Sequence, residues 1–284
     1  MIEINSLTDL KNIDVFFIDV FGVLWDGYEF YPEGLAVCEK LIASGKKIYV
    51  LTNATMLSDE FKKKRAKKGF IQGVHYTDVI TSGDVMKHQI ENEDFIDSLA
   101  GKKDSKFYII GQPNNALFEN VLHRQTGVLD KADIFYIGSL FDGIELHGDF
   151  DYLLPEANQI LKTGKPVFCA NPDYFAFHGD FKHVTAGSLA RWFEENGANV
   201  SWTGKPYGNI YEYALRLAGA DAGVCAMVGD TVRTDIVGGH RAKMKTVLLT
   251  KTGVVADEIQ AGATLDGIFK RDGVVPDYLI ERLK

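Results

Sequence analysis

Cysteine, proline and long apolar runs are scarce in this sequence. Of its 284 residues, 3 are cysteine and 7 are proline. Cys38, Cys169 and Cys225 form neither a CxxC pair nor the spacing of a zinc site, and each lies among apolar residues, so we expect reduced cysteines in the core. The amino-terminal stretch MIEINSLTDLKNID lacks the features of a secretory leader, and no apolar stretch is long enough to span a membrane. We therefore expect a cytoplasmic protein.

Basic residues are fewer than acidic residues. The chain has 31 basic and 39 acidic residues, a net charge of −8, which argues against nucleic acid or an anionic membrane as a partner. The one basic run, residues 62–68, follows Ser58-Asp59-Glu60. We interpret it as the solvent-exposed face of a capped helix rather than as a targeting or polyanion-binding patch. An anionic ligand must therefore be held by local groups.

The remaining composition is that of an ordinary globular protein, with 46% hydrophobic and 25% charged residues. Short apolar runs alternate with helical patterns, which predicts an α/β fold with a Rossmann-like parallel sheet covered on both faces. The predicted strands are 15–19, 47–52, 107–110, 134–137, 167–170, 199–203, 224–229 and 246–250. The predicted helices are 33–44, 58–68, 113–124, 151–163, 187–196 and 207–218, most of them closed by a glycine.

The length leaves two organisations open, one large domain or a core that carries a second domain. No repeat, low-complexity tract or Pro/Ser-rich linker is present, so a second domain would be inserted rather than appended. The polar segments 91–105 and 178–185 are the clearest breaks. We therefore expect a core of residues 1–95 and 183–284 and a smaller α/β insert of residues 96–182.

The first candidate for chemistry is Asp19, which ends the apolar run 15–18. An ionised carboxylate at the end of a buried strand is costly unless a cation meets it, which points to a metal or a substrate. In open α/β sheets the ligand crevice lies at this end of the strands. From this segment alone, a carboxylate that caps the next turn is an equal alternative.

A second pair of carboxylates gives a more specific pattern. Asp230 directly follows the apolar run 224–229, and Asp235 comes five residues later, near the start of a helix. Two acidic groups this close repel each other unless a hard cation neutralises them. Mg²⁺ is usually held by one or two carboxylates together with water and substrate oxygens, so this spacing favours a Mg²⁺ site.

Two further strand ends carry polar groups. Thr52 and Asn53 follow strand 47–52 and can donate hydrogen bonds to a phosphate, although a turn or helix cap explains them more simply. The tetrapeptide Thr-Gly-Lys-Pro occurs twice, with Lys165 between a helix and a strand and Lys205 between a strand and a helix. We therefore place Lys205 at the carboxyl edge of the sheet and Lys165 in a surface loop.

Taken in order, these segments resemble the four motifs of the haloacid dehalogenase superfamily, and two others resemble its NagD-like class IIA phosphatase subgroup. The superfamily motifs are DVFGVL at 19–24, LTN at 51–53, GKP at 204–206 and GDTVRTDI at 229–236, and the subgroup features are NPD at 171–173 and TAGSL at 185–189. The resemblance extends from about residue 13 to residue 255. It implies a Rossmann-like core with an inserted α/β cap domain.

The resemblance also implies roles for individual residues. Asp19 would be the nucleophile, and Thr52, Asn53 and Lys205 would complete the catalytic set. The implied Mg²⁺ ligands are Asp19, the backbone carbonyl of Phe21, Asp230 and Asp235, the last of which would bind or orient water on the metal. The implied substrate contacts are Gly22, Asn171 and Asp173. His178, at the end of the aromatic segment 174–180, is a further predicted substrate contact.

Phe21 departs from the family pattern. Phosphatases of this family usually carry a second Asp at that position, which protonates the leaving alcohol and later activates water. Phenylalanine can do neither, and general acid–base catalysis contributes about 10²–10⁴-fold. Asp26 could replace the missing acid, but Asp26-Gly27 first of all indicates a turn. We therefore expect slow turnover, or esters whose leaving groups need little protonation.

The leading hypothesis is a Mg²⁺-dependent phosphatase that acts on small phosphorylated metabolites of the sugar-phosphate or aryl-phosphate type through an aspartyl-phosphate. The alternative is a catalytically impaired protein that binds Mg²⁺ and phosphorylated ligands for sensing or assembly, which Phe21 favours. Transfer to another acceptor, or a carbon–phosphorus or carbon–halogen substrate, is a third option. A homo-oligomer formed through the cap also stays open.

Overall fold

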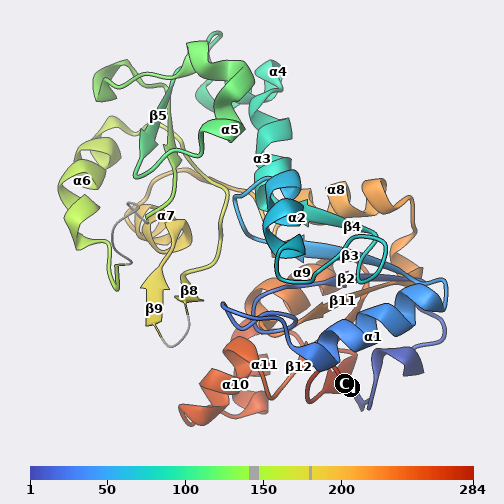
Figure 1. Ribbon diagram of the computed structural model, residues 1–284. Coiled ribbons are helices and arrows are strands. Elements are labelled where there is room, and N and C mark those ends of the chain that lie inside the picture. The colour runs from blue at the N-terminus through green and yellow to red at the C-terminus, as the bar shows by residue number, and fades with distance from the viewer. Residues whose placement is uncertain (141–146, 179–180) are drawn as a thin grey trace. The chain divides into compact units, whose positions relative to one another are not determined.

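The chain forms two compact units (Figure 1). The computed structural model describes residues 1–140, 147–178 and 181–284, with the backbone alone at 177, 178 and 181. The core unit consists of Met1–Thr52, Ser58–Thr81 and Lys205–Lys284, and the insert unit consists of Asn53–Leu57 and Ser82–Gly204. The predicted insert, residues 96–182, falls inside the insert unit, and its boundaries as a separate domain stay a prediction.

The core unit contains a seven-stranded sheet in which every pairing is parallel. Its order is β1-β13-β12-β11-β2-β3-β4. The strands are β1 Ile2–Glu3, β2 Val15–Ile18, β3 Lys47–Thr52, β4 Asp78–Thr81, β11 Cys225–Gly229, β12 Lys245–Leu249 and β13 Tyr278–Ile280. The central strands are apolar runs, and every residue of β2 and β11 is buried, as expected for a sheet covered on both faces.

Helices connect these strands and pack on the sheet. Helix α1 packs against β3, and α2 packs against β4. The helices of the core unit are α1 Pro32–Ala43, α2 Ser58–Ala66, α8 Gly208–Ala218, α9 Val237–Arg241, α10 Gly253–Gln260 and α11 Leu265–Asp272. A π-helical turn, Val232–Ile236, precedes α9, and short 3₁₀ turns lie at Leu7–Asp9 and Ala222–Val224.

The order of the strands places a topological switch point in the middle of the sheet. From β2 the chain moves through β3 to β4 in one direction, and from β11 it moves through β12 to β13 in the other. Strands β2 and β11 are paired in parallel, with Ile18 opposite Val228. The two chain segments that leave their carboxyl ends therefore separate there, and such a point is where open α/β sheets bind ligands.

The insert unit has its own four-stranded parallel sheet, in the order β10-β7-β6-β5, and an antiparallel hairpin of β8 and β9. The strands are β5 Phe107–Ile110, β6 Ile134–Ile137, β7 Val167–Cys169, β8 Phe175–His178, β9 Phe181–Val184 and β10 Val200–Trp202. The helices are α3 Ser82–Ile90, α4 Glu93–Ala100, α5 Asn115–Phe118, α6 Leu154–Thr163 and α7 Ala186–Glu195. The 3₁₀ turns of this unit are Glu119–Arg124, Leu129–Lys131 and Asp151–Leu153.

Alternation along the strands of the insert unit supplies two hydrophobic clusters. On β6, Phe135 and Ile137 belong to one cluster, and Ile134 and Tyr136 belong to the other. Since successive side chains of a strand point to opposite faces, the sheet has an apolar core on each face. Helices α6 and α7 contribute to the first cluster, and α3 and α4 contribute to the second.

These observations confirm the predicted class, an α/β protein with a parallel core sheet and an inserted, smaller α/β part. Each of the eight predicted strands is present within one or two residues of its predicted bounds. The three cysteines are free and buried, as predicted. No helix among the described residues is long and apolar enough to cross a membrane.

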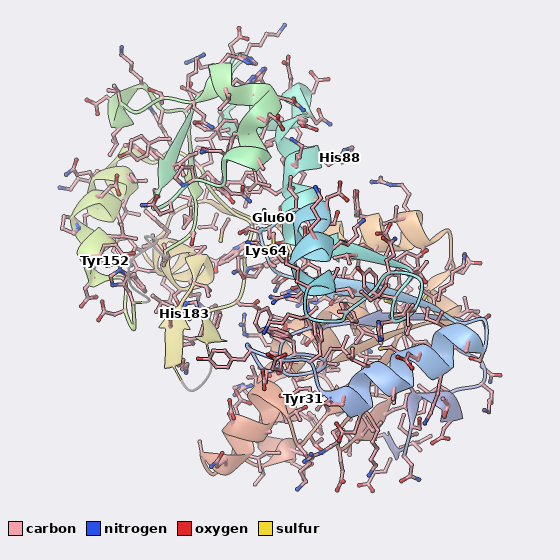
Figure 2. All side chains as sticks on the ribbon, viewed as in Figure 1. Tyr31, Glu60, Lys64, His88, Tyr152 and His183 are labelled. Atoms are coloured by element: carbon pink, nitrogen blue, oxygen red, sulfur yellow. The ribbon has the colours of Figure 1, made fainter. Side chains whose placement is uncertain are left out.

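The predicted solvent-exposed basic face lies on helix α2 and the turn after it, and Lys62 and Arg65 are its partly exposed members. Lys64 is exposed and pairs with Glu60 on the same helix (Figure 2), and Lys62 pairs with Asp78. Arg65 is different, because its guanidinium packs over aromatic rings instead of facing an acidic partner. The interpretation of the whole run as a solvated face is therefore wrong at this residue.

Candidate active site

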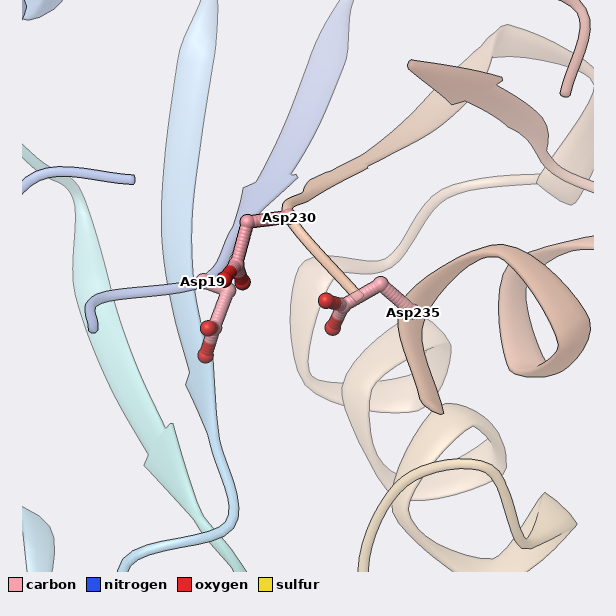
Figure 3. A group of neighbouring side chains, drawn as sticks. All are labelled: Asp19, Asp230 and Asp235. Atoms are coloured by element: carbon pink, nitrogen blue, oxygen red, sulfur yellow. The ribbon is translucent and has the colours of Figure 1, made fainter. Parts of the chain in front are cut away.

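Three carboxylates from separate segments meet at the switch point of the core sheet. Asp19 follows β2, Asp230 follows β11, and Asp235 lies in the π-helical turn (Figure 3). One oxygen of each lies within 4.8 Å of the others. Asp230 and Asp235 are 2% and 0% exposed, and the side chain of Asp19 is 13% exposed. The cluster is thus buried, with Asp19 as its accessible member.

Lys205 provides the positive charge inside this cluster. Its Nζ lies 2.6 Å from Oδ1 of Asp19 and 2.7 Å from Oδ1 of Asp235, and the residue is 2% exposed. The other lysine of the repeated tetrapeptide, Lys165, donates instead to the carbonyl of Ala132. The structure therefore brings together Asp19, Lys205, Asp230 and Asp235, and leaves Lys165 out.

One ammonium group does not neutralise three carboxylates. Burial, followed by the charges of Asp19 and Asp235, raises the pKa of Asp230 well above its ordinary value. Burial also raises the pKa of Asp235 to about 7, although Lys205 opposes the shift. Such a set of hard oxygen donors with surplus negative charge suits a hard divalent cation, which would offset the repulsion.

Glycine makes room for two of the carboxylates. A Cβ at Gly22 would lie 2.4 Å from Oδ2 of Asp230, and one at Gly253 would lie 1.9 Å from the same atom. A Cβ at Gly229 would lie 2.2 Å from the carboxyl group of Asp235. Gly22 and Gly253 also have positive φ angles, 76° and 67°, which favour glycine. The backbone therefore packs directly against these carboxylates and leaves no space for a side chain at the three glycines.

Backbone amides fix the orientation of the same carboxylates. The amide of Val254 donates to Oδ2 of Asp230 at 2.6 Å, and the amide of Thr231 donates to Oδ2 of Asp235 at 3.1 Å. The buried hydroxyl of Tyr211 donates to the carbonyl of Thr234 at 3.1 Å and so supports the π-helical turn. Gly253, Val254 and Tyr211 were absent from the sequence-based prediction. The Thr-Gly pair after strand 246–250 was the one available signal for this loop.

Replacing Gly253 by alanine should weaken divalent cation binding as well as stability. The strain of a positive φ costs about 1–2 kcal/mol, and the new Cβ also displaces the carboxylate of Asp230. Gly273→Ala is the matched control, since Gly273 has a φ of 71° and no atom within 4 Å of a new Cβ. Thermal unfolding with and without Mg²⁺ measures both effects. Equal loss of Mg²⁺ binding in the two variants would contradict this view of Gly253.

Other predicted residues of the core unit also lie near these strand ends. Thr52 ends β3, the neighbour of β2, and is buried. Phe21 is 38% exposed, so its side chain is open to solvent two residues after Asp19. Asp26 accepts hydrogen bonds from the amides of Tyr28 and Glu29, both at 2.8 Å, and these bonds lower its pKa. Asp26 is therefore a turn residue and is poorly suited to act as an acid.

The predicted residues of the insert unit form a separate hydrogen-bonded group. Nδ2 of Asn53 donates to Oδ1 of Asp173 at 3.0 Å, and the amide of Asp173 donates to Oδ1 of Asn171 at 3.1 Å. Asn53 is 3% exposed. The predicted contact of His178 lies outside the described residues, since its side chain is not described. The roles of all these residues stay predictions.

Two family profiles match the chain, one over its amino-terminal part and one near its carboxyl end. The profile described as haloacid dehalogenase-like hydrolase matches residues 16–124, and the one described as HAD-hydrolase-like matches residues 202–281. The first match contains Asp19, and the second contains Lys205, Asp230 and Asp235. Both matches therefore include parts of the carboxylate cluster.

Curated proteins and solved structures show the same likeness over most of the chain. A 4-nitrophenylphosphatase from Schizosaccharomyces pombe is 25% identical over 294 residues, which cover 96% of this chain and 93% of that protein. A putative NipSnap protein from Caenorhabditis elegans is 27% identical over 254 residues, and this chain matches 81% of its own length but 47% of that protein.

Among solved structures, a haloacid dehalogenase-like hydrolase from Brucella suis 1330 has a TM-score of 0.81 and 22% identity, with 99% of this chain and 100% of that chain covered. NagD from Escherichia coli K-12 has a TM-score of 0.65 and 20% identity, with 95% and 97% covered. At these identities the two structures show a shared fold.

Proposed function

Because the chain belongs to the haloacid dehalogenase superfamily and to its NagD/p-nitrophenylphosphatase class IIA subgroup, we propose that it is a Mg²⁺-dependent phosphatase of small phosphorylated metabolites. The observation that carries the proposal is the buried group of Asp19, Asp230 and Asp235 with the ammonium of Lys205 between two of them. Sugar phosphates and aryl phosphates are the substrate types that we propose.

Asp19 acts as the nucleophile in this proposal. A carboxylate oxygen of Asp19 attacks phosphorus as the bond from phosphorus to the leaving oxygen breaks, which gives an aspartyl-phosphate and an alkoxide or phenoxide that takes its proton from water. Water then attacks the same phosphorus, releasing inorganic phosphate and the carboxylate. Two displacements with lower barriers thus replace one difficult displacement. The exposure of Asp19, greater than that of Asp230 or Asp235, supports its choice as the attacking group.

The other residues hold charge and orientation. Mg²⁺, when bound by Asp19, Asp230, Asp235 and the carbonyl of Phe21, would offset the charge of the transferring phosphoryl oxygens. Lys205 holds Asp19 and Asp235 in fixed positions and supplies a second positive charge. In this proposal, Thr52 and Asn53 donate hydrogen bonds to the phosphoryl group, and Gly22, Asn171, Asp173 and His178 contact the substrate.

Phe21 limits the substrates that turn over well. It offers no proton to the leaving oxygen, and Asp26 is engaged in its turn. We therefore propose slow hydrolysis of alkyl phosphates, whose leaving groups need a proton, and faster hydrolysis of aryl phosphates. An assay with aryl phosphates and a panel of sugar, nucleotide and pyridoxal phosphates, with and without Mg²⁺, tests the proposal. Absence of Mg²⁺-dependent turnover on every substrate would favour a ligand-binding protein instead.

The pKa values give a prediction for pH. The pKa of Asp235 is about 7 in the folded protein against an ordinary value of 3.8, so the folded state holds this proton more tightly than the unfolded state. The free energy of unfolding of the metal-free protein should therefore fall as pH rises from about 4 to about 7. Mg²⁺ binds the ionised form, so its affinity should rise by up to about tenfold per pH unit in the same window.

Thermal unfolding across this pH range, in a chelator and in saturating Mg²⁺, measures both trends. We expect the Tm in chelator to fall with rising pH and the increase in Tm caused by Mg²⁺ to grow. If the pH dependence of the metal-free Tm through this window were the same in wild type and in Asp235→Asn, a raised pKa at Asp235 would be contradicted.

A further inference from the structure

Arg65 of helix α2 lies over a group of aromatic rings next to the loop that follows Asp19. Its Cζ is 4.3 Å from the centre of the Trp25 ring, 5.4 Å from that of Phe61 and 5.9 Å from that of Phe21. All three distances are within the range of cation–π contacts, and a guanidinium stacks well on indole. The rings therefore hold the guanidinium in place.

These rings are part of a larger packed group. Trp25 lies 4.5 Å from Phe30, Phe30 lies 4.6 Å from Phe70, and Phe70 lies 4.5 Å from Tyr76, measured between ring centres. Trp25 is 2% exposed. A rigid aromatic base of this kind leaves Arg65 few alternative positions, which lowers the entropy cost of binding a ligand there.

Within the described residues, Arg65 has no acidic partner. The neighbouring acids are engaged by lysines, since Lys62 pairs with Asp59 and Asp78 and Lys64 pairs with Glu60. Nε of Arg65 and Nε1 of Trp25 are both buried donors without a hydrogen-bond acceptor in the described part of the chain. Burial, with no opposing charge, lowers the pKa of Arg65. The guanidinium therefore has a positive charge that no acidic side chain of the described residues neutralises.

Two members of the group, Phe21 and Trp25, lie in the loop that directly follows the nucleophile. The amide of Gly22 donates to the carbonyl of Trp25 at 2.9 Å, and the amide of Trp25 donates to the carbonyl of Val20 at 2.8 Å. This tight loop brings Phe21 and Trp25 together two to six residues after Asp19. Arg65 is partly exposed and Phe21 is 38% exposed, so a ligand can reach both.

We propose that Arg65 and Phe21 form a recognition site for a second oxyanion on the leaving group of the substrate, with Arg65 as a specificity-determining residue. A carboxylate or a second phosphate would accept hydrogen bonds from the guanidinium, and the ring of Phe21 would pack against the body of the leaving group. This inference rests on the proposed phosphatase function, because it assumes that the substrate is esterified at Asp19.

Phenyl phosphate and 4-carboxyphenyl phosphate provide a matched pair of probes, since they differ by one carboxylate on the leaving group. In Arg65→Gln, kcat/KM for 4-carboxyphenyl phosphate should fall about tenfold, as expected for loss of a charge-assisted hydrogen bond, and kcat/KM for phenyl phosphate should change less than about twofold. Lys64→Gln removes a neighbouring charge on the same helix and should change neither value.

Arg65→Lys is a second variant that tests the inference if Arg65→Gln folds poorly. It keeps the charge and loses the planar fork, so about a threefold loss is expected for 4-carboxyphenyl phosphate alone. An equal fall for both substrates in Arg65→Gln and Arg65→Lys, or no fall for either, would overturn the inference and leave the phosphatase proposal intact.

Failure of the phosphatase proposal can also be distinguished from failure of the inference about Arg65. If the wild-type protein hydrolyses neither these probes nor any other phosphate ester of the panel, the phosphatase proposal fails, and calorimetric titration of the same proteins with 4-carboxyphenyl phosphate decides the inference. Binding that weakens about tenfold in Arg65→Gln would support the anion site. Unchanged binding in that variant would overturn it.

Discussion

Replacing Asp19 by asparagine should lower kcat on aryl phosphates by at least about 10⁴-fold. Asparagine has nearly the same shape, but its amide does not form the phosphoryl ester, so the covalent route is lost. The loss should appear in kcat rather than in KM, because Lys205, Asp230 and Asp235 stay in place. A steady-state assay with 4-nitrophenyl phosphate and Mg²⁺ measures it.

The thermal stability of Asp19→Asn shows whether this variant is folded. The charge of Asp19 helps to raise the pKa of Asp230, so its removal should relieve repulsion and raise the Tm of the metal-free protein. Asp26→Asn is the matched control, since Asp26 serves a turn seven positions away, and its kcat should stay within about threefold of wild type. If Asp19→Asn kept most of its activity, Asp19 could not be the nucleophile.

The second large effect is a gain. Phe21→Asp should raise kcat on alkyl phosphates by about 10²-fold, the lower end of what a general acid contributes. The position is 38% exposed and lies two residues after the nucleophile, where phosphatases of this family usually carry their acid. Aryl phosphates should gain much less, since their leaving groups need little protonation. Parallel assays with an alkyl and an aryl phosphate measure the difference.

Phe21→Asn is the control for this substitution. It removes the ring and its contact with Arg65 in the same way but supplies no proton, so it should not increase turnover of alkyl phosphates. Equal gains in Phe21→Asp and Phe21→Asn would mean that the bulk of Phe21, and not the missing acid, limits the rate. No gain in Phe21→Asp would mean that another group already protonates the leaving oxygen.

The meeting of Asp19 and Asp230 could be predicted because each directly follows a short apolar run. Parallel strands end at one edge of the sheet, so Asp19, Thr52 and Asp230 must lie along the same edge once the strands are recognised. Lys205 does contact Asp19, as predicted, but the strand before it, β10, belongs to the sheet of the insert unit, so the rule that led to the choice of Lys205 over Lys165 does not explain this contact. Periodicity and strand polarity were sufficient for Asp19, Thr52 and Asp230 alone.

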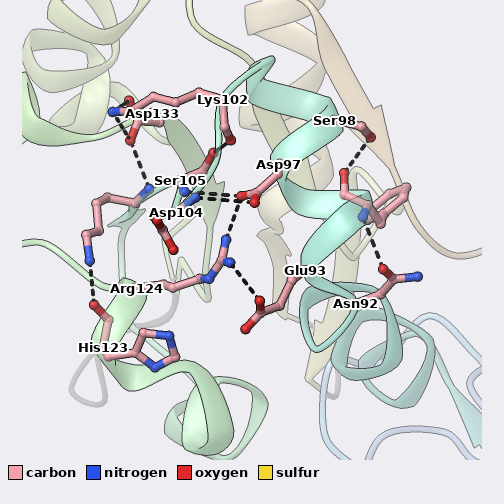
Figure 4. Close-up of polar contacts among 12 residues, drawn as sticks. Asn92, Glu93, Asp97, Ser98, Lys102, Asp104, Ser105, His123, Arg124 and Asp133 are labelled. Atoms are coloured by element: carbon pink, nitrogen blue, oxygen red, sulfur yellow. Dashed lines mark hydrogen bonds and ion pairs between the residues drawn. The ribbon is translucent and has the colours of Figure 1, made fainter.

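Segment 91–105 is polar but contains a helix, so polarity alone did not identify its structure. It looked like a break, yet it contains helix α4, with Asn92 as its amino-terminal cap and Gly101 in the left-handed conformation at its end. Asp97 accepts hydrogen bonds from the amides of Asp104 and Ser105 and from the guanidinium of Arg124, which is 2% exposed (Figure 4). The charged residues are used within the fold, through partners that are distant in sequence.

Gly253 and Arg65 could not be found for a related reason. The importance of Gly253 depends on the atom that faces it, the carboxylate of Asp230, and nothing in its neighbours along the chain indicates that approach. Arg65 lies in a run of lysines. It differs from them because its guanidinium packs on the ring of Trp25, which is 40 positions earlier in the sequence. Local patterns predict elements, whereas contacts of this kind depend on how the elements meet.

The pairing of β2 with β11 also has a consequence during synthesis on the ribosome. Strand β2, with the sequence VFFI, emerges early, but its partner on one side begins at Cys225. Until then an apolar strand has an unpaired backbone edge, which is the kind of surface that promotes aggregation of nascent chains. We expect a chaperone, or transient shielding by already completed helices, to protect this edge while the intervening residues are translated.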